Sequence, residues 1–193
     1  NVLDDYVNTA NINTLTSLNV SYNNISDLTG IEAFIALDTL YCYYNQLTSL
    51  NVSQNTALIV LNCSDNQLTS LDVSQNTALT GLGCESNQLT SLNVRNGNNT
   101  NFTDFYAYGN PNLYCINVDD ATWSTANWTV ANQNIDSQSY FSNNCPPSAI
   151  QEQTTNKELL KITDLLGRET KATNQLLFYL YNDGTVVKKV VIE

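Results

Sequence analysis

The sequence predicts a mainly β solenoid, in which short coils stack and each contributes a strand to a parallel sheet, with few short helices. Residues 37–57, 58–78 and 79–101 are three copies of one segment, each about 21 residues long. Apolar and polar residues alternate at the start of each copy, as in a strand that buries one face. One coil cannot bury its own apolar face, whereas a stack of coils can.

Each part of the repeated segment has a structural interpretation. In residues 37–57, the alternation at Leu40–Tyr41–Cys42 predicts a short strand, and Asn45 follows where the chain must turn. The Asn45 amide can hydrogen-bond backbone groups that the bend leaves unpaired. More divergent copies occupy residues 15–36 and 102–120, and the in-phase asparagines predict a column: Asn23, Asn45, Asn66, Asn87 and Asn110. The closing "QNTA" is too short for a helix of more than one turn.

The pattern L-x-x-L-x-L-x-x-N-x-L over residues 15–120 resembles the leucine-rich-repeat family, with cysteine in the third leucine place of three copies. The segment "NQLTSLDVSQNTAL" is similar to repeats of secreted Bacteroidetes proteins. The resemblance implies a parallel sheet on one face of the solenoid, with turns and short extended segments opposite. Residues 1–14 look like the end of that family's N-terminal cap, whose earlier part would precede Asn1 in a longer precursor.

The five cysteines form two groups. Cys42, Cys63 and Cys84 recur in phase, so we expect them to be buried as small hydrophobic residues. Metal binding is the alternative, but tightly packed side chains leave no room for a metal ion and its ligands, and the sequence has no histidine.

Residues 111–145 resemble the C-terminal cap of these repeat proteins. The resemblance implies a Cys115–Cys145 disulfide, and thus an oxidising compartment. Two tryptophans in this cap, Trp123 and Trp128, are expected to cover the last coil rather than bind a ligand.

Beyond a predicted linker at 146–156, residues 157–193 contain two β-rich runs on either side of Asn182-Asp183-Gly184, which predicts a β-hairpin. This segment resembles a short sorting domain of the Bacteroidetes type IX secretion system. The matching residues are Asp164–Glu169, Tyr181, Gly184, Lys188 and Lys189. The resemblance implies export through the periplasm and across the outer membrane, with Gly167 and Arg168 as the expected recognition residues. The alternative is a hairpin that packs on the cap.

Charge and composition exclude several classes of function. The net charge is −11, and Arg95 is the only basic residue before Lys157, so nucleic acid is not an expected partner. No apolar run is long enough to span a membrane. Without histidine, Ser-His and Cys-His nucleophilic pairs cannot form, and no phosphate-binding glycine motif occurs. The composition leaves a Ser-Lys or two-carboxylate mechanism open as the alternative, but we expect no enzyme, cofactor or metal. The Asp119–Asp120 pair is expected to cap turns, with calcium binding as the alternative.

The outward residues of the predicted strands line one face of the sheet. Several are tyrosines, which suit contacts with protein or sugar because a flat apolar ring carries a polar tip. The candidate ligand-binding residues are Tyr22, Tyr41, Tyr43, Tyr44, Asp65, Glu85, Tyr106 and Tyr108. We expect a secreted or cell-surface module that binds an extracellular protein. The alternatives are a glycan-binding protein, a structural surface-layer component whose tyrosines only shield the sheet, or an ice-binding protein that uses Thr48, Thr69 and Thr90.

Overall fold

The computed structural model describes residues 12–146, 159–163, 175–181 and 186–191. The chain divides into two units, Asn1–Ser148 and Ala149–Glu193.

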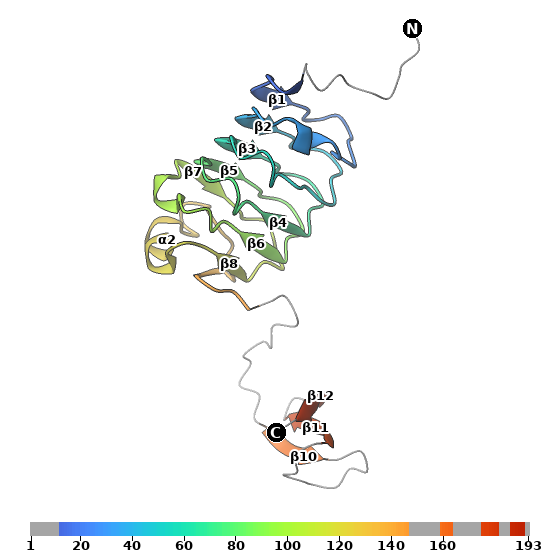
Figure 1. Ribbon diagram of the computed structural model, residues 1–193. Coiled ribbons are helices and arrows are strands. Elements are labelled where there is room, and N and C mark those ends of the chain that lie inside the picture. Colours follow the sequence, from blue (N-terminus) through green and yellow to red (C-terminus); the bar gives the residue numbers. More distant parts are fainter. Residues whose placement is uncertain (1–11, 147–158, 164–174, 182–185, 192–193) are drawn as a thin grey trace, which may run out of the picture. The chain divides into compact units, whose positions relative to one another are not determined.

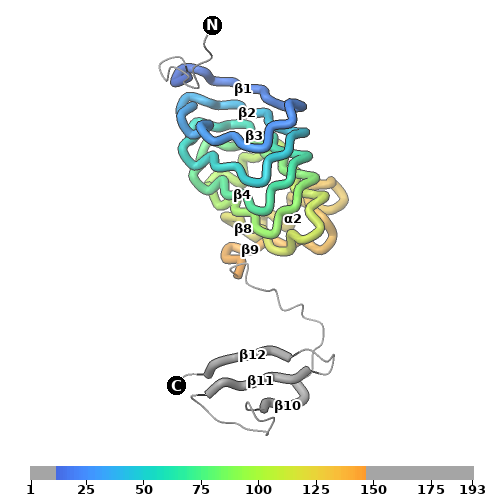
Figure 2. The backbone as a smooth tube through the Cα atoms, turned by 90° about the vertical axis from the view of Figure 1, so that its right-hand side faces the viewer, coloured from blue at the N-terminus to red at the C-terminus, as the bar shows by residue number. Residues whose placement is uncertain are grey.

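In the first unit, coils stack along one axis (Figures 1 and 2). Its strands are β1 (Ser17–Asn19), β2 (Thr39–Tyr41), β3 (Val60–Asn62), β4 (Ser70–Asp72), β5 (Gly81–Gly83), β6 (Ser91–Asn93), β7 (Asp104–Tyr106), β8 (Cys115–Asn117) and β9 (Tyr140–Ser142). Its helices are the 3-10 turns η1 (Ile31–Ala33) and η2 (Asn99–Asn101), and α2 (Ala121–Asn127).

The predicted parallel sheet has the order β1-β2-β3-β5-β7, with one strand from each coil. Its central residues Leu18, Leu40, Leu61, Leu82 and Phe105 stand in register. Leu40, Leu61 and Leu82 are fully buried. Alternation within each strand therefore places the leucines in the core and their neighbours outside, which confirms the predicted stacking of coils.

A second parallel sheet, with the order β4-β6-β8-β9, forms where only turns and short extended segments were expected. Leu71 pairs with Leu92, and Ile116 pairs with both Leu92 and Phe141. All four side chains belong to the same core as the leucines of the first sheet. The "SLDV" and "SLNV" stretches are thus strands in their own right, and the core lies between two sheets.

The predicted asparagine column closes the turns that follow the first sheet. Asn66 accepts a hydrogen bond from the Leu47 N–H at 2.9 Å and donates to the carbonyls of Cys42 and Cys63, at 3.0 and 3.1 Å. Asn45, Asn87 and Asn110 make the equivalent contacts between their own pairs of coils. Each amide satisfies backbone groups that a buried turn would otherwise leave unpaired.

A second column of buried asparagines was not predicted. Asn55 donates to the carbonyls of Ile31 and Phe34, at 2.8 and 3.0 Å. Asn76 donates to those of Val52 and Asn55, at 3.0 and 2.9 Å. Both asparagines are fully buried. They belong to the "QNTA" segments, so these short turns are held by side-chain amides together with backbone hydrogen bonds such as that from the Leu58 N–H to the Asn55 carbonyl.

The cysteines behave as expected. Cys115 and Cys145 form the predicted disulfide, while Cys42, Cys63 and Cys84 are free and fully buried. Burial raises the pKa of all three free thiols, that of Cys42 to about 12. Burial therefore favours the neutral thiol, and the three side chains form part of the core.

Aromatic residues cover the last coil, as predicted for the C-terminal cap. The Trp128 ring stacks on Phe105 with centroids 4.1 Å apart, and Trp123 meets Trp128 edge-on at 5.5 Å. The cap also completes the asparagine column. Asn134 donates to the Phe105 carbonyl at 2.7 Å, and the Asp136 carboxylate accepts from the N–H groups of Gly109 and Asn110. These contacts replace the next coil of the solenoid.

The second unit contains an antiparallel sheet of β10 (Leu159–Thr163), β11 (Gln175–Tyr181) and β12 (Val186–Val191). The antiparallel pairing of β11 with β12 confirms the predicted hairpin. Of the expected sorting residues, Lys188 and Lys189 lie in β12, opposite Phe178 and Leu177. Gly167, Arg168 and Gly184 lie outside the described residues, as does most of the expected N-terminal cap at 1–14. No described helix is long and apolar enough to cross a membrane.

Candidate functional site

The outward surface of the β1-β2-β3-β5-β7 sheet and of the turn that follows it is called here the tyrosine face. Register places Tyr41 and Tyr106 in one row across this sheet, with Asn62 and Gly83 between them. The chain stays paired beyond the strands, since the N–H groups of Tyr44, Asp65 and Ser86 each donate to the carbonyl of the next coil. All eight candidate residues lie on this face: Tyr22, Tyr41, Tyr43, Tyr44, Asp65, Glu85, Tyr106 and Tyr108.

Four tyrosines form a cluster on the first two coils. The rings of Tyr22 and Tyr44 stack with centroids 4.7 Å apart and an interplanar angle of 11°. Tyr43 meets Tyr22 edge-on at 5.3 Å and Tyr41 edge-on at 6.3 Å. Tyr22 and Tyr44 remain 65% and 50% exposed despite these contacts. The sequence did not predict that Tyr22 joins the tyrosines of the next coil as a stacked pair.

Two of these tyrosines adopt a backbone conformation that aromatic residues rarely take. Tyr22 and Tyr44 have φ of 60° and 52°, at the turn position that Asp65, Ser86 and Gly109 fill in the later coils. Left-handed backbone is least costly for glycine, asparagine or aspartate, and it is strained for a bulky residue. Such a conformation persists only where the surrounding structure fixes it, and here the same turn recurs in five successive coils. The turn thus holds two exposed aromatic rings where a smaller residue would fit better.

Two carboxylates, those of Asp65 and Glu85, lie between this cluster and the tyrosines of the fifth coil. Glu85 is partly buried, and its Oε2 atom is buried without a hydrogen-bond partner. Burial raises the pKa of the Glu85 carboxyl and the charge of Asp65 adds to the rise, while a hydrogen bond with the Glu85 backbone and one with the Ser64 side chain oppose it. Glycine at position 83 leaves room for the Glu85 carboxylate, because a Cβ there would lie 3.1 Å from Oε2.

Tyr106 and Tyr108 border the carboxylates on the other side, with exposed fractions of 38% and 36%. Burial raises the pKa of the Tyr108 phenol, and the charges of Glu85 and Asp65 raise it further. The tyrosine face combines aromatic rings at both ends with negative charge in the middle.

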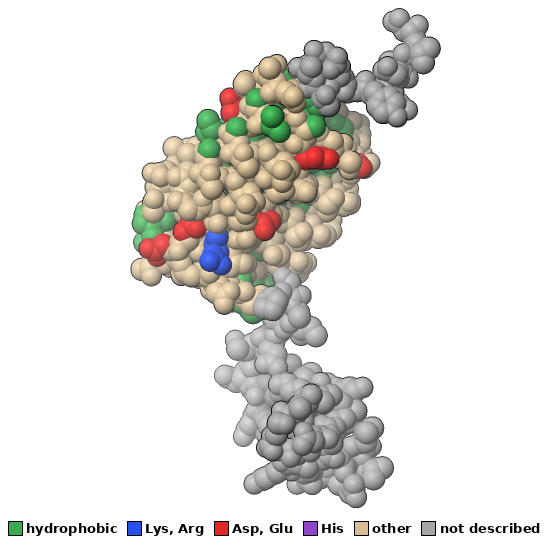
Figure 3. Space-filling model, viewed as in Figure 1, with side chains coloured by type: hydrophobic (Ala, Val, Ile, Leu, Met, Phe, Trp, Pro, Cys, Tyr) green, Lys and Arg blue, Asp and Glu red, His purple; other side chains and the backbone are tan. Residues whose placement is uncertain are grey.

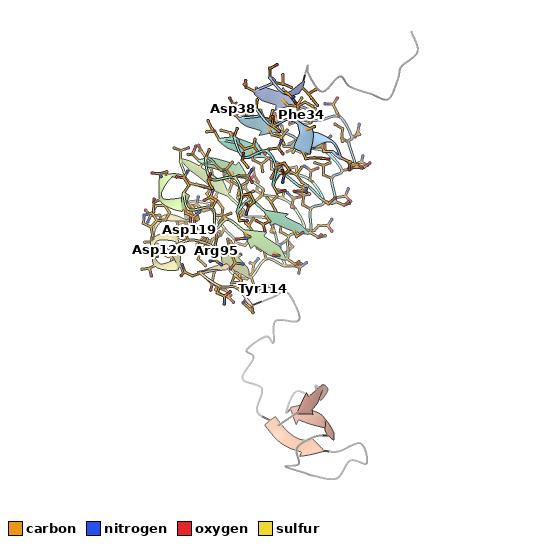
Figure 4. All side chains as sticks on the ribbon, viewed as in Figure 1. Phe34, Asp38, Arg95, Tyr114, Asp119 and Asp120 are labelled. Atoms are coloured by element: carbon orange, nitrogen blue, oxygen red, sulfur yellow. A yellow bond between two sulfur atoms is a disulfide. The ribbon has the colours of Figure 1, made fainter. Side chains whose placement is uncertain are left out.

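Other polar candidates have structural tasks. Asp120 caps α2 by accepting hydrogen bonds from the N–H groups of Thr122 and Trp123. Asp119 accepts from the N–H groups of Gly97 and Asn99. Figure 4 labels both aspartates on the solenoid. Asp119 therefore holds a turn, as expected, whereas Asp120 caps a helix. Within the described ranges, no group of three or more histidine, cysteine or acidic residues is placed to hold a metal ion.

Charge is sparse on the surface, and positive charge is rarer still. In the view of Figure 3, uncharged atoms cover most of the surface, and the blue of Lys and Arg side chains appears in one patch. Arg95 is the only lysine or arginine among residues 12–146, and it follows β6 in the second sheet. Chemically, the tyrosine face offers ring faces, phenol hydroxyls and carboxylates, which suit binding.

Comparison with known proteins agrees with the fold. A family model described as leucine-rich repeat matches residues 11–34. The chain is 46% identical over 52 residues to internalin J of Listeria monocytogenes serotype 4b (strain F2365), a match over 27% of this chain and 6% of that protein. A solved structure of the functional domain of InlJ from Listeria monocytogenes, described as including a cysteine ladder, is 41% identical with a TM-score of 0.53. That match covers 56% of this chain and 24% of the other. The first unit is a leucine-rich-repeat solenoid.

Proposed function

We propose that this chain is a non-enzymatic, secreted or cell-surface binding module that holds an extracellular protein on its tyrosine face. The carrying observation is the stacked pair Tyr22–Tyr44, kept exposed on left-handed backbone beside further tyrosines and two carboxylates. Exposed tyrosines contribute large contact areas with few rotatable bonds, as is common in protein interfaces. The similarity to internalin J supports a binding rather than a catalytic role, although the chain matches only a small part of that protein.

Replacing Tyr44 with asparagine separates binding from folding. Asparagine tolerates the left-handed backbone of position 44, so we expect the stability to change little. Binding should fall by at least about tenfold because the ring stack is lost. The measurement is cross-linking capture of surface proteins by the full chain, followed by titration of the captured protein. Tyr140→Ser, on β9 of the second sheet, is the matched control and should bind normally.

The alternative functions of the tyrosine face, glycan binding and a purely structural role, predict different results in such assays. A glycan-array signal that disappears with Tyr44→Asn would identify the chain as a glycan-binding protein. Normal surface assembly together with no captured protein and no glycan signal would identify a structural surface component. Either result contradicts the proposal of a protein partner.

The tail supplies a second, separate proposal, which is export by type IX secretion. Its support is the Asp164–Glu169 motif together with Lys188 and Lys189 in the final strand. A fusion of a fluorescent protein to residues 149–193 should reach the medium or the surface of a bacterium that has this secretion system. The variant Arg168→Ala should leave the fusion in the periplasm. Export that is unaffected by this variant and by deletion of residues 164–193 would contradict the proposal.

A further inference from the structure

The part of the tyrosine face with the most unusual chemistry is its centre. Asp65 occupies the left-handed turn position that Tyr22 and Tyr44 take in the preceding coils. Glu85 lies one coil further along, where the Asp65 N–H donates to the Glu85 carbonyl at 3.0 Å. Two acidic side chains thus stand in neighbouring coils, between the four-tyrosine cluster and Tyr108.

No basic side chain of the described solenoid neutralises these acids. The sole candidate among residues 12–146, Arg95, belongs to the second sheet, where it follows β6. Glu85 is only partly buried: its Oε2 atom is enclosed by the protein, while the residue keeps some exposure on the tyrosine face. A partly buried carboxylate is incompletely solvated, so a cation that reaches its exposed side gains a strong, charge-assisted hydrogen bond.

The surrounding rings define what kind of donor fits. Tyr22, Tyr43 and Tyr44 present stacked and edge-on rings next to Asp65, and Tyr108 lies on the far side of Glu85. The negative charge of Asp65 raises the pKa of the Tyr22 phenol, after the effects of burial and of Tyr44 and Tyr43, so Asp65 acts on this cluster as it does on Tyr108. A group that enters between them must be cationic, flat enough to lie on a phenol ring, and able to donate several hydrogen bonds.

We infer that the centre of the tyrosine face binds an arginine side chain of the partner protein, with its guanidinium held by Asp65 and Glu85 and stacked against tyrosine. Guanidinium is planar, donates in parallel pairs to carboxylates and stacks on aromatic rings, whereas the ammonium of lysine is a compact and strongly hydrated charge. The acidic balance of the whole chain, −11, also favours a basic partner. This inference rests on the proposed protein-binding function and names the chemistry of the partner.

The test uses a capped Gly-Gly-Arg-Gly-Gly peptide, titrated into the isotopically labelled full chain and followed by NMR. We expect shifts at Tyr44, Asp65, Glu85 and Tyr108, and weaker binding of the matched citrulline and lysine peptides. The double variant D65N/E85Q should weaken binding about tenfold by removing both charges. D72N, on β4 of the second sheet, is the matched control and should bind as the wild type does.

Three results would overturn the arginine assignment: equal binding of the citrulline or lysine peptide, shifts confined to the second sheet, or unchanged affinity in D65N/E85Q. Thermal unfolding of each variant verifies that it is folded, and Glu85→Gln should not destabilise, since it removes a poorly solvated charge. If the arginine assignment fails while Tyr44→Asn still abolishes capture of the protein partner, the proposed function stands. If capture is also insensitive to Tyr44→Asn, both fail.

Discussion

Replacing Asn66 with alanine should lower the free energy of unfolding of the solenoid by about 3–5 kcal/mol. The Asn66 side chain accepts from the Leu47 N–H and donates to the carbonyls of Cys42, Cys63 and Ser64. The Leu47 N–H is buried at this contact, so alanine leaves an orphaned donor and also removes the two amide N–H groups that the three carbonyls share. One amide therefore links two coils, and alanine cannot replace any of its bonds.

Urea denaturation followed by tryptophan fluorescence measures this effect on the solenoid alone, because both tryptophans, Trp123 and Trp128, lie in the first unit. Gln67→Ala is the matched control, since Gln67 is the exposed neighbour and its substitution should change stability by less than about 0.5 kcal/mol. Asn66→Asp should also destabilise, because a carboxylate would face the three carbonyls. If Asn66→Ala lowers the free energy of unfolding by less than about 1 kcal/mol, water hydrogen-bonds the backbone groups of this turn in place of the amide, contrary to the prediction.

The asparagine column was predictable because its members recur in phase at a position where a coil must bend. The second column contains Asn55 and Asn76, which also recur in phase, in the repeated "QNTA" segment. It was interpreted only as a short turn, since asparagine favours turns whether its side chain points inward or outward. An asparagine that recurs at the same position in each copy, with unchanged polar neighbours, indicates that its side chain is buried. The strands of the second sheet were missed because the family resemblance implied only turns and short extended segments opposite the first sheet, and "SLDV" was assigned to one of those.

The tyrosine face was predictable in part. Strand alternation placed Tyr41 and Tyr106 outward, and the structure agrees. The left-handed backbone at Tyr22 and Tyr44 was not predictable, because aromatic residues disfavour it and a turn motif usually signals it through glycine or asparagine. The environment of Glu85 likewise depends on side chains from neighbouring coils, such as Asn62 and Tyr108, which a linear sequence does not bring together.

Removal of the disulfide in the double variant Cys115→Ser/Cys145→Ser should lower the free energy of unfolding by about 3–4 kcal/mol. The two cysteines are 30 residues apart, and cross-linking a loop of this size reduces the conformational entropy of the unfolded chain. The serine pair leaves the loop open, and urea denaturation with tryptophan fluorescence reports the loss. Reducing agent added to the wild type should reproduce it, whereas the same agent should leave the double variant unchanged.

Thiol titration distinguishes this disulfide from the buried cysteines. Folded wild-type protein should expose no reactive thiol, because Cys42, Cys63 and Cys84 are fully buried and burial raises their pKa. Unfolding without reductant should release those three thiols, and reductant should raise the total to all five cysteines of the chain. Five reactive thiols without reductant would contradict the pairing.

The structural consequence of the disulfide concerns the end of the solenoid rather than its middle. Cys145 is held to β8 both by its bond to Cys115 and by donation of its N–H to Asn117 Oδ1 at 2.7 Å. The loop that the bond closes carries Trp128 and Phe141, whose rings cover Phe105 in the last coil of the first sheet. Opening it would free this cover first. We therefore expect amide hydrogen exchange in the double variant to accelerate most in β8 and β9, and least in β2 and β3; equal acceleration in all strands would contradict a cap that unfolds before the coils.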